Sequence, residues 1–349
     1  MTTNIAINGM GRIGRIIARR YITDPPPGIK LVAANDLFSP DDIAYLMRYD
    51  SVHGRAPFEV ESTANSLRLD GQEVDMRHEK DPSDLPWADL GVDIVLECTG
   101  LFRDRDKAAK HLEAGASKVI ISAPSDTADL SIILGVNQDK YDPRVHHVVS
   151  NTSCTTNSLA PVAKVLNDSF GVELLMATTV HAYTASQKLV DGPARKKRRG
   201  RAAALSLVPT TTGAANATAR TIPELEGKMF ATAIRAPVPD GAITDISALL
   251  KQEVTEDMVN NALRGAAEGP MNGILGVSED ELVSQDIITD PRSSIIDARS
   301  TKVVAERMVK VLAWYDNEYG FSCRMLDLAS YMARLGGMDR ERRAEMVRA

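Results

Sequence analysis

The pattern that most restricts the fold of this chain is a glycine-rich turn close to its N-terminus. Gly9, Gly11 and Gly14 follow the spacing G-x-G-x-x-G, directly after an apolar run at residues 4–8 and directly before a helical pattern that begins at Ile13. Such a turn lets backbone amides at a helix start approach a pyrophosphate. The motif alone is weak evidence, but between a strand and a helix it predicts the first unit of a dinucleotide-binding sheet.

An acidic residue follows the next apolar run. Asp36 comes directly after residues 30–35, about 20 residues beyond the glycines, where a carboxylate can accept a hydrogen bond from a ribose 2′-hydroxyl. The same carboxylate would repel a 2′-phosphate, so Asp36 favours NAD over NADP. An alternative is that Asp36 only caps a turn, but the spacing favours the first interpretation.

Hydrophobic patterning divides the chain into two halves. The first half alternates short apolar runs with helical patterns, and the second has longer β-rich stretches, as in a mixed and mostly antiparallel sheet. The fold class is therefore predicted as α/β, a Rossmann-type doubly wound parallel sheet followed by an α+β domain. We expect strands at 30–35, 93–98, 118–122, 131–136, 173–183, 229–236, 242–252, 294–299 and 308–315, and helices at 104–114, 154–170, 256–267 and 323–335.

Composition excludes several classes of protein. The chain has 349 residues and a net charge of -6, which gives no general attraction to nucleic acid. Three cysteines, an odd number, argue against a disulfide framework and for a reducing compartment, so we expect a cytoplasmic protein. No signal peptide and no membrane-spanning run is recognisable, so no membrane partner is expected.

Cys154 is the strongest candidate nucleophile. It lies between an apolar run at 147–150 and the helical pattern at 159–170, so its thiol is predicted at a helix N-terminus. The positive end of the helix dipole stabilises a thiolate, and we therefore expect an ionised sulfur at rest. Cys98, inside an apolar run, and Cys323, in the last helix, are interpreted as packing residues.

Two further groups of residues suit chemistry at this sulfur. His181 ends an apolar stretch, and an imidazole beside a thiolate can activate sulfur and carry the proton of an addition step, although a histidine at a strand end is often structural. Thr184, the segment 210–213 and Arg235 supply hydroxyl, amide and guanidinium donors suited to phosphate.

The motifs together resemble phosphorylating glyceraldehyde-3-phosphate dehydrogenase, in order, from about residue 4 to residue 335. Six dispersed segments in register are much more specific than any one of them. The segments are Asn8–Arg15, Tyr49–Gly54, Ser153–Asn157, Thr178–Thr184, Pro209–Ala215 and Trp314–Glu318.

The resemblance implies a reaction and a set of site residues. Cys154 would add to the aldehyde of glyceraldehyde 3-phosphate, His181 would act as its base, and hydride transfer to NAD would leave a thioester that inorganic phosphate cleaves. Thr184, Arg199 and Arg235 would hold the substrate phosphate, and Ser153, Thr155, Thr212 and Gly213 the attacking phosphate. Cofactor contacts would come from Gly9, Gly11, Arg12, Ile13, Gly14, Asp36, Lys80, Ser122 and Asn317, and no metal is expected.

The resemblance also implies an organisation of the chain. Residues 1–153, completed by a C-terminal helix at 318–335, would form the NAD-binding domain, and 154–317 the catalytic domain. Residues 336–349 are interpreted as a short charged tail, solvated or frayed. We expect a homotetramer, because the loop that the family uses at a subunit interface is present in full length.

A basic run in that loop has three alternative interpretations. Residues 195–201 carry six cationic side chains. They are interpreted as a solvated loop, as charges near the adenosine ribose that soften the NAD preference, or as a docking surface for an acidic partner. Gly192, where some strict NAD enzymes have leucine, leaves NADP as an alternative cofactor. Erythrose-4-phosphate dehydrogenase, from the same family, is the alternative enzyme, and a paralogue retained for binding is the alternative outside enzymes.

Overall fold

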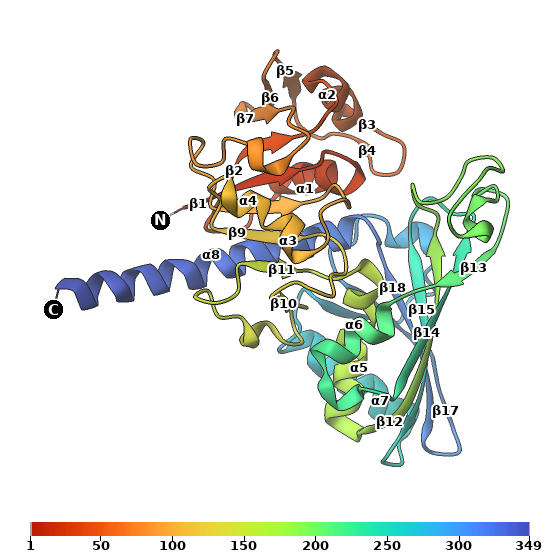
Figure 1. The fold of residues 1–349 in the computed structure, drawn as a ribbon. Coiled ribbons are helices and arrows are strands. Elements are labelled where there is room, and N and C mark those ends of the chain that lie inside the picture. The colour runs from red at the N-terminus through yellow and green to blue at the C-terminus, as the bar shows by residue number, and fades with distance from the viewer. Residues whose placement is uncertain (1, 349) are drawn as a thin grey trace. The chain divides into compact units, whose positions relative to one another are not determined.

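The apolar runs of the first half form the centre of a nine-stranded sheet. The computed structural model describes residues 2–348, with side chains up to residue 336 at the C-terminal end. The chain divides into two compact units, the first containing the chain up to Ile132, Asp139–Thr152 and the chain from Ser322 onward, the second Ile133–Gln138 and Ser153–Phe321. The nine strands belong to the first unit (Figure 1).

Seven of the nine strands are parallel, in the order β10-β11-β9-β8-β1-β2-β7, and β6 and β5 continue the sheet antiparallel. Central strands such as β8 are buried along their length, because helices cover both faces of such a sheet. The elements are β1 (Thr3–Asn8), α1 (Arg12–Thr23), β2 (Ile29–Asn35), α2 (Pro40–Arg48), β3 (Tyr49–Asp50), β4 (Gly54–Arg55), β5 (Val60–Ser62), β6 (Ser66–Leu69), β7 (Gln72–Arg77), η1 (Pro82–Asp84), β8 (Ile94–Glu97), α3 (Arg105–Ala108), α4 (Lys110–Glu113), β9 (Lys118–Ile121), β10 (Leu130–Ser131), η2 (Gln138–Lys140) and β11 (Val148–Ser150).

One strand prediction in this half was wrong. The run at 131–136 contributes only the two-residue β10, and the chain then turns. The Asn137 side chain accepts from the backbone N–H of Ile133, and Gly135 takes a φ of +82°, which no strand allows. Burial of an apolar run is common to strands and buried turns, so the pattern alone did not distinguish them.

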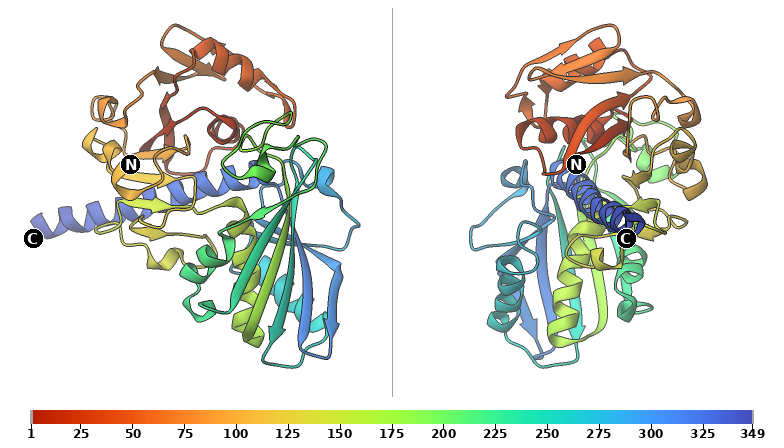
Figure 2. Two further views of the ribbon diagram at one scale, coloured as in Figure 1. Left: turned by 45° about the vertical axis from the view of Figure 1, so that its right-hand side comes forward. Right: turned by 90° about the vertical axis from the view of Figure 1, so that its left-hand side faces the viewer.

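The second unit contains a seven-stranded mixed sheet, in the order β13-β14-β12-β15-β18-β17-β16. Only the pairs β12–β14 and β16–β17 are parallel, and the predicted fold class is confirmed. Helices α5, α6 and α7 cover one face, with the apolar core between (Figure 2). The elements are α5 (Cys154–Phe170), β12 (Val172–Ala182), η3 (Lys197–Gly200), β13 (Val208–Thr211), α6 (Ala214–Thr221), η4 (Pro223–Leu225), β14 (Met229–Ala236), β15 (Ala242–Leu250), α7 (Glu256–Glu268), β16 (Leu275–Ser278), η5 (Ser284–Ile287), β17 (Ser294–Val304) and β18 (Met308–Tyr315).

The C-terminal helix α8 (Tyr319–Arg348) starts close to the predicted position but continues beyond it. Its backbone is helical through the segment that we interpreted as a tail, while the prediction that this segment is solvated concerns side chains outside the described residues. Among residues 2–348, no helix has both the length and the apolar composition needed to cross a membrane.

The backbone of the glycine-rich turn requires glycine at two of its three glycine positions, Gly9 and Gly14. Gly9 has a φ of +97°, and a Cβ at Gly14 would lie 2.0 Å from the carbonyl oxygen of Gly9. A Cβ at Gly11 would meet nothing within 4 Å, so the space above this residue is open to a ligand.

We therefore expect opposite effects of two alanine substitutions. Gly14→Ala should lower the free energy of unfolding by about 1 to 3 kcal/mol, because α1 must move away from the turn. Gly11→Ala should leave stability almost unchanged and weaken NAD binding. Chemical denaturation and a binding titration of both variants check this, and an unchanged stability of Gly14→Ala would contradict it.

Candidate active site

The sulfur of Cys154 faces an imidazole. Cys154 is the first residue of α5, and its neighbour Ser153 caps the helix by accepting from the backbone N–H of Thr156 at 3.1 Å. The Sγ atom lies 3.4 Å from Nε2 of His181, the penultimate residue of β12. The structure thus brings together the two residues predicted as nucleophile and base, which are 27 positions apart in sequence.

The other ring nitrogen of His181 is held by the backbone. Nδ1 lies 2.7 Å from the carbonyl oxygen of Ala182, which can only accept, and 2.9 Å from Nη1 of Arg235, which can only donate. In the tautomer that donates from Nδ1 to this carbonyl, Nε2 presents a lone pair to the thiol. Arg235 is the register partner of His181 in the parallel pair β12–β14, and its Nη1 donates to the same carbonyl at 2.8 Å.

Burial controls the protonation of this pair. Burial raises the pKa of the Cys154 thiol, while Arg235 and the backbone N–H of Thr155 act in the opposite direction. Burial, followed by the nearby Arg235 charge, lowers the pKa of His181 to about 3, so its imidazole is a neutral base at neutral pH. The N-terminus of α5 favours the thiolate, as the sequence predicted, but burial has the larger effect on the thiol pKa. The helix end alone therefore does not ionise the resting sulfur, and the thiol proton needs an acceptor.

Tyr315 supports this pair, and sequence reasoning gave it no role. Its hydroxyl lies 3.0 Å from Oγ1 of Thr155 and 2.8 Å from Oγ1 of Thr179, and its ring stands edge-on to His181 with centroids 6.0 Å apart. Burial raises the pKa of Tyr315, so the hydroxyl stays protonated. The available signal was its buried position in the alternation of β18, the last strand before Asn317.

Two arginines give the site a positive charge that no acid neutralises. Among the described residues, neither Arg199 nor Arg235 forms an ion pair with a carboxylate, and the buried Nε of Arg235 has no hydrogen-bond acceptor. Burial lowers the pKa of Arg235, and Arg199 lowers it further because the two charges repel. Buried cations without counterions are costly, which favours an anionic ligand here.

Hydroxyl groups connect to these arginines. Arg199 donates through Nε to Thr210 at 3.1 Å and through Nη1 to Ser186 at 3.3 Å, and Ser186 lies 2.8 Å from Thr184. Thr184 is thus joined to Arg199 through Ser186, which sequence reasoning missed because isolated serines are common in turns.

The four residues predicted for the attacking phosphate lie at two helix starts. Ser153 and Thr155 open α5, and Thr212 and Gly213 precede α6, where Thr212 Oγ1 accepts from the backbone N–H of Ala214 at 3.2 Å. Within the described part of the chain, no hydrogen bond joins the two pairs directly. Helix N-termini attract anions through their unpaired N–H groups.

The predicted cofactor residues of the first unit surround the glycine turn. Arg12 is paired with Asp50 at 2.6 Å, so its guanidinium is engaged. Although burial alone raises the pKa of Asp50, the backbone amides of His53 and Val52 together with Arg12 lower it to about 2. Arg12 and Ile13 are the first residues of α1, where helix N–H groups lack partners within the helix.

Asp36 has both predicted roles available to it. Its carboxylate accepts from the backbone N–H of Met10 at 2.7 Å and of Phe38 at 3.0 Å, which ties the loop after β2 to the glycine turn. A cavity of about 320 Å³ adjoins it, lined in part by Gly11, Phe38 and Tyr45. Each carboxylate oxygen can accept a second hydrogen bond, as a ribose hydroxyl would require.

Three further predicted cofactor residues lie on loops at strand ends. Lys80 is exposed after β7, and Ser122 follows β9, where its N–H donates to the carbonyl of Glu97. Asn317, after β18, is buried, and its Oδ1 has no donor among the described residues. A buried carbonyl oxygen without a donor suits the N–H₂ group of a nicotinamide carboxamide. The open space beside Gly11 suits a pyrophosphate.

Comparison with known proteins gives matches over both units. The C-terminal domain of glyceraldehyde 3-phosphate dehydrogenase matches residues 153–317, and its NAD binding domain matches residues 3–105. A glyceraldehyde-3-phosphate dehydrogenase of Geobacillus stearothermophilus is 53% identical over 336 residues, 96% of this chain and 100% of the relative. Glyceraldehyde-3-phosphate dehydrogenase 1 of Bacillus subtilis is 51% identical over the same shares, and glyceraldehyde-3-phosphate dehydrogenase 2 of Streptomyces avermitilis is 47% identical over 95% of this chain and 99% of the relative.

The Cys154–His181 contact leads to a prediction about thiol reactivity. At neutral pH, His181→Asn should slow alkylation of Cys154 by iodoacetamide by roughly tenfold or more, because the raised thiol pKa makes thiolate formation depend on the base. The difference should shrink at alkaline pH, where hydroxide removes the proton instead. An alkylation rate equal to that of the wild type would exclude His181 as the base.

Proposed function

Because this chain belongs to the glyceraldehyde-3-phosphate dehydrogenase family, we propose that it oxidises D-glyceraldehyde 3-phosphate, with NAD and inorganic phosphate, to 1,3-bisphosphoglycerate. The reaction is that of glycolysis and gluconeogenesis. The observation that carries the proposal is the sulfur of Cys154 at 3.4 Å from a neutral imidazole, together with two half-buried arginines, Arg199 and Arg235, that have no carboxylate partner among the described residues.

Cys154 and His181 carry the covalent steps. The sulfur forms a bond to the aldehyde carbon while His181 Nε2 takes the thiol proton, and the carbonyl electrons move to oxygen. The protonated Nε2 and the backbone N–H of Cys154 then stabilise this oxyanion. NAD, when bound, supplies the acceptor for the hydride that leaves the thiohemiacetal carbon.

The resulting thioester is cleaved by phosphate. A phosphate oxygen attacks the thioester carbon, the carbon–sulfur bond breaks, and the acyl phosphate leaves while Cys154 regains its proton. We propose that Arg235, Arg199 and Thr184 hold the phosphate of the substrate, which would supply the counterion that the two guanidiniums lack. Ser153, Thr155, Thr212 and Gly213 are proposed to hold the attacking phosphate.

The NAD contacts are proposed to come from loops and one helix start. The turn Gly9–Gly14 and the first amides of α1, at Arg12 and Ile13, would face the pyrophosphate. Asp36 would accept from the ribose, and Asn317 Oδ1 would accept from the nicotinamide carboxamide. Lys80 and Ser122 are the remaining proposed contacts, in loops after β7 and β9.

The proposed organisation follows the sequence analysis. Residues 1–153 with 318–335 would bind NAD, and 154–317 would carry the catalysis. A cytoplasmic location is proposed because Cys98, Cys154 and Cys323 are all free thiols, as a reducing compartment maintains them.

A homotetramer is proposed on the basis of one sheet face. The side chains of Leu174, Met176 and Phe230 on β12 and β14 are 56%, 62% and 61% exposed, and Leu249 and Met308 extend this apolar face by register. An apolar face of this kind on a soluble protein marks an interaction surface, and a second copy of the chain is its proposed occupant.

The reaction is tested by the phosphate dependence of NADH formation. With glyceraldehyde 3-phosphate and NAD, steady-state turnover should require added phosphate, because the thioester must be cleaved to release the sulfur. Erythrose 4-phosphate and NADP, tested in parallel, should support slower turnover. Turnover that does not depend on phosphate would contradict the formation of an acyl phosphate.

The oligomer is tested by placing one charge on the sheet face. Phe230→Glu should shift the sedimentation equilibrium from tetramer toward smaller species, because symmetry repeats the buried charge. Val283→Lys, a similarly exposed apolar position outside this face, is the control and should leave the tetramer intact. A tetramer that withstands Phe230→Glu would contradict the proposed interface.

A further inference from the structure

A row of buried polar side chains crosses the carboxyl ends of three adjacent strands in the first unit. Asn35 ends β2, Asn8 ends β1 and Glu97 ends β8, and the sheet register places them side by side. All three are nearly inaccessible, at 5%, 1% and 1% exposed. A buried carboxylate is costly unless hydrogen bonds compensate it, so the arrangement requires a reason.

Hydrogen bonds join this row to the loops that follow the strands. Asn35 Nδ2 donates to Asn8 Oδ1 at 2.7 Å, and Asn8 Nδ2 donates to Glu97 Oε2 at 2.6 Å. At one end, the Asn35 amide bonds both backbone groups of Glu79, at 2.8 and 2.9 Å. At the other end, Glu97 Oε1 accepts from the backbone N–H of Thr99 at 2.8 Å and from its hydroxyl.

The row therefore fixes the loops at the carboxyl edge of the sheet. These loops begin at Gly9, Asp36, His78 and Cys98, after β1, β2, β7 and β8. The first three contain residues that we proposed as NAD contacts. A ligand at this edge of a parallel sheet is held by the same loops.

Two fully buried side chains, Trp87 and His111, complete the hydrogen bonds of the row. Trp87 Nε1 donates to His111 Nδ1 at 2.9 Å, and an indole N–H can only donate. His111 therefore carries its proton on Nε2, which donates to Glu97 Oε2 at 3.0 Å. Asn8 Nδ2, His111 Nε2 and the backbone N–H of Thr99 thus all donate to the Glu97 side chain.

We propose that Glu97 and His111 are positioning residues for NAD. The buried carboxylate of Glu97 holds the cofactor loops in place, and His111, with its proton on Nε2, donates a further hydrogen bond to that carboxylate. This inference rests on the proposed function. Neither residue needs to touch the cofactor, since both act through the backbone of Thr99 and the side chain of Asn8.

Glu97→Gln is the most direct perturbation, because its new amide N–H₂ would face a neighbouring N–H donor at either carboxylate position. In place of Oε1 it would face the backbone N–H of Thr99, and in place of Oε2 it would face Asn8 Nδ2 and His111 Nε2. Asn8 cannot turn its amide, since its Oδ1 accepts from Asn35, which both backbone groups of Glu79 hold in place. His111 cannot move its proton to Nδ1 while Trp87 donates there.

The experiment measures NAD affinity directly, by calorimetric titration of the full-length protein. Glu97→Gln should raise the Kd for NAD by about tenfold, while kcat at saturating NAD changes by less than about twofold, since the catalytic unit is untouched. An unchanged Kd would overturn the inference. A wild-type protein that binds no NAD would overturn the proposed function as well, which separates the two failures.

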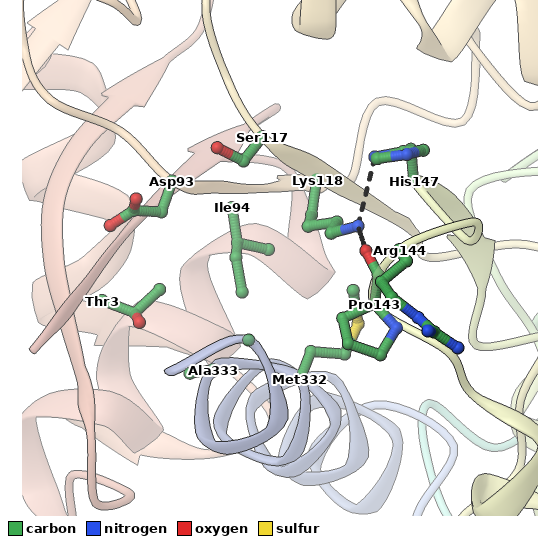
Figure 3. A pocket seen from close by; sticks show the side chains of 11 residues that line it. Thr3, Asp93, Ile94, Ser117, Lys118, Pro143, Arg144, His147, Met332 and Ala333 are labelled. Carbon is green, nitrogen blue, oxygen red and sulfur yellow. Dashed lines mark hydrogen bonds between the residues drawn. The ribbon is translucent and has the colours of Figure 1, made fainter. Parts of the chain in front are cut away.

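Lys118→Met is the matched control for general destabilisation. Lys118 lies at the opposite, amino end of β9, where its ammonium donates to the carbonyl of Pro143 and to Nδ1 of His147 at 3.1 Å (Figure 3). It also donates to the carbonyl of His146 at 3.0 Å. Its loss should lower the thermal midpoint without raising the Kd for NAD. An equal rise in Kd for this variant would mean that stability, not positioning, sets the affinity.

A second substitution tests the proton assignment. In Glu97→Gln combined with Trp87→Phe, the indole donor is gone, so His111 can protonate on Nδ1. Its Nε2 can then accept from the new amide N–H₂, which takes the place of Glu97 Oε2 at 3.0 Å. The double variant should bind NAD within about threefold of Trp87→Phe alone. Purely additive losses would overturn the assignment.

A final pair avoids the change of charge, in case Glu97→Gln does not fold. His111→Gln can place an amide N–H near the position of Nε2 and keep the bond to Glu97, whereas His111→Asn reaches only the position of Nδ1. His111→Asn should bind NAD about threefold more weakly than His111→Gln. Equal affinities would contradict the positioning role.

Discussion

The contact between the sulfur of Cys154 and Nε2 of His181 is the interaction on which the proposed chemistry of this protein depends. The fold supplies it with two rigid elements, since the sulfur stands on the first residue of α5 and the imidazole on the end of β12. Burial lowers the pKa of His181 and raises that of the Cys154 thiol. Burial therefore favours the uncharged form of both groups at rest. The helix end and Arg235 favour the thiolate, and His181 is the proposed acceptor of the thiol proton when sulfur attacks.

The same constraint explains the positive charge around the pair. Arg235 is the register neighbour of His181, close enough to lower its pKa, and Arg199 adds a second guanidinium. These cations have no carboxylate partner among the described residues, which is the basis for proposing that they hold the phosphate of the substrate. The site thus contains a local electrostatic cost that the proposed phosphate ligand offsets.

Sequence reasoning succeeded where local pattern determines structure. β14 and β18 begin and end where predicted, and α5 begins at Cys154, because the hydrophobic pattern of each segment is a local signal. It failed at 131–136, where an apolar run is buried as a turn. It also gave no role to Ser186, Glu97 or His111, nor to Tyr315, whose partners Thr155 and Thr179 lie 160 and 136 positions away in sequence. Such contacts depend on strand register, which hydrophobic pattern alone does not specify.

The central claim is that Cys154 becomes acylated before phosphate takes part. The most direct test mixes the protein with glyceraldehyde 3-phosphate and NAD in the absence of phosphate, then quenches in acid for intact and peptide mass analysis. The account predicts a burst of NADH close to one per active site and an acyl group on the peptide that contains Cys154. No burst, or an acyl group on any other residue, would contradict it.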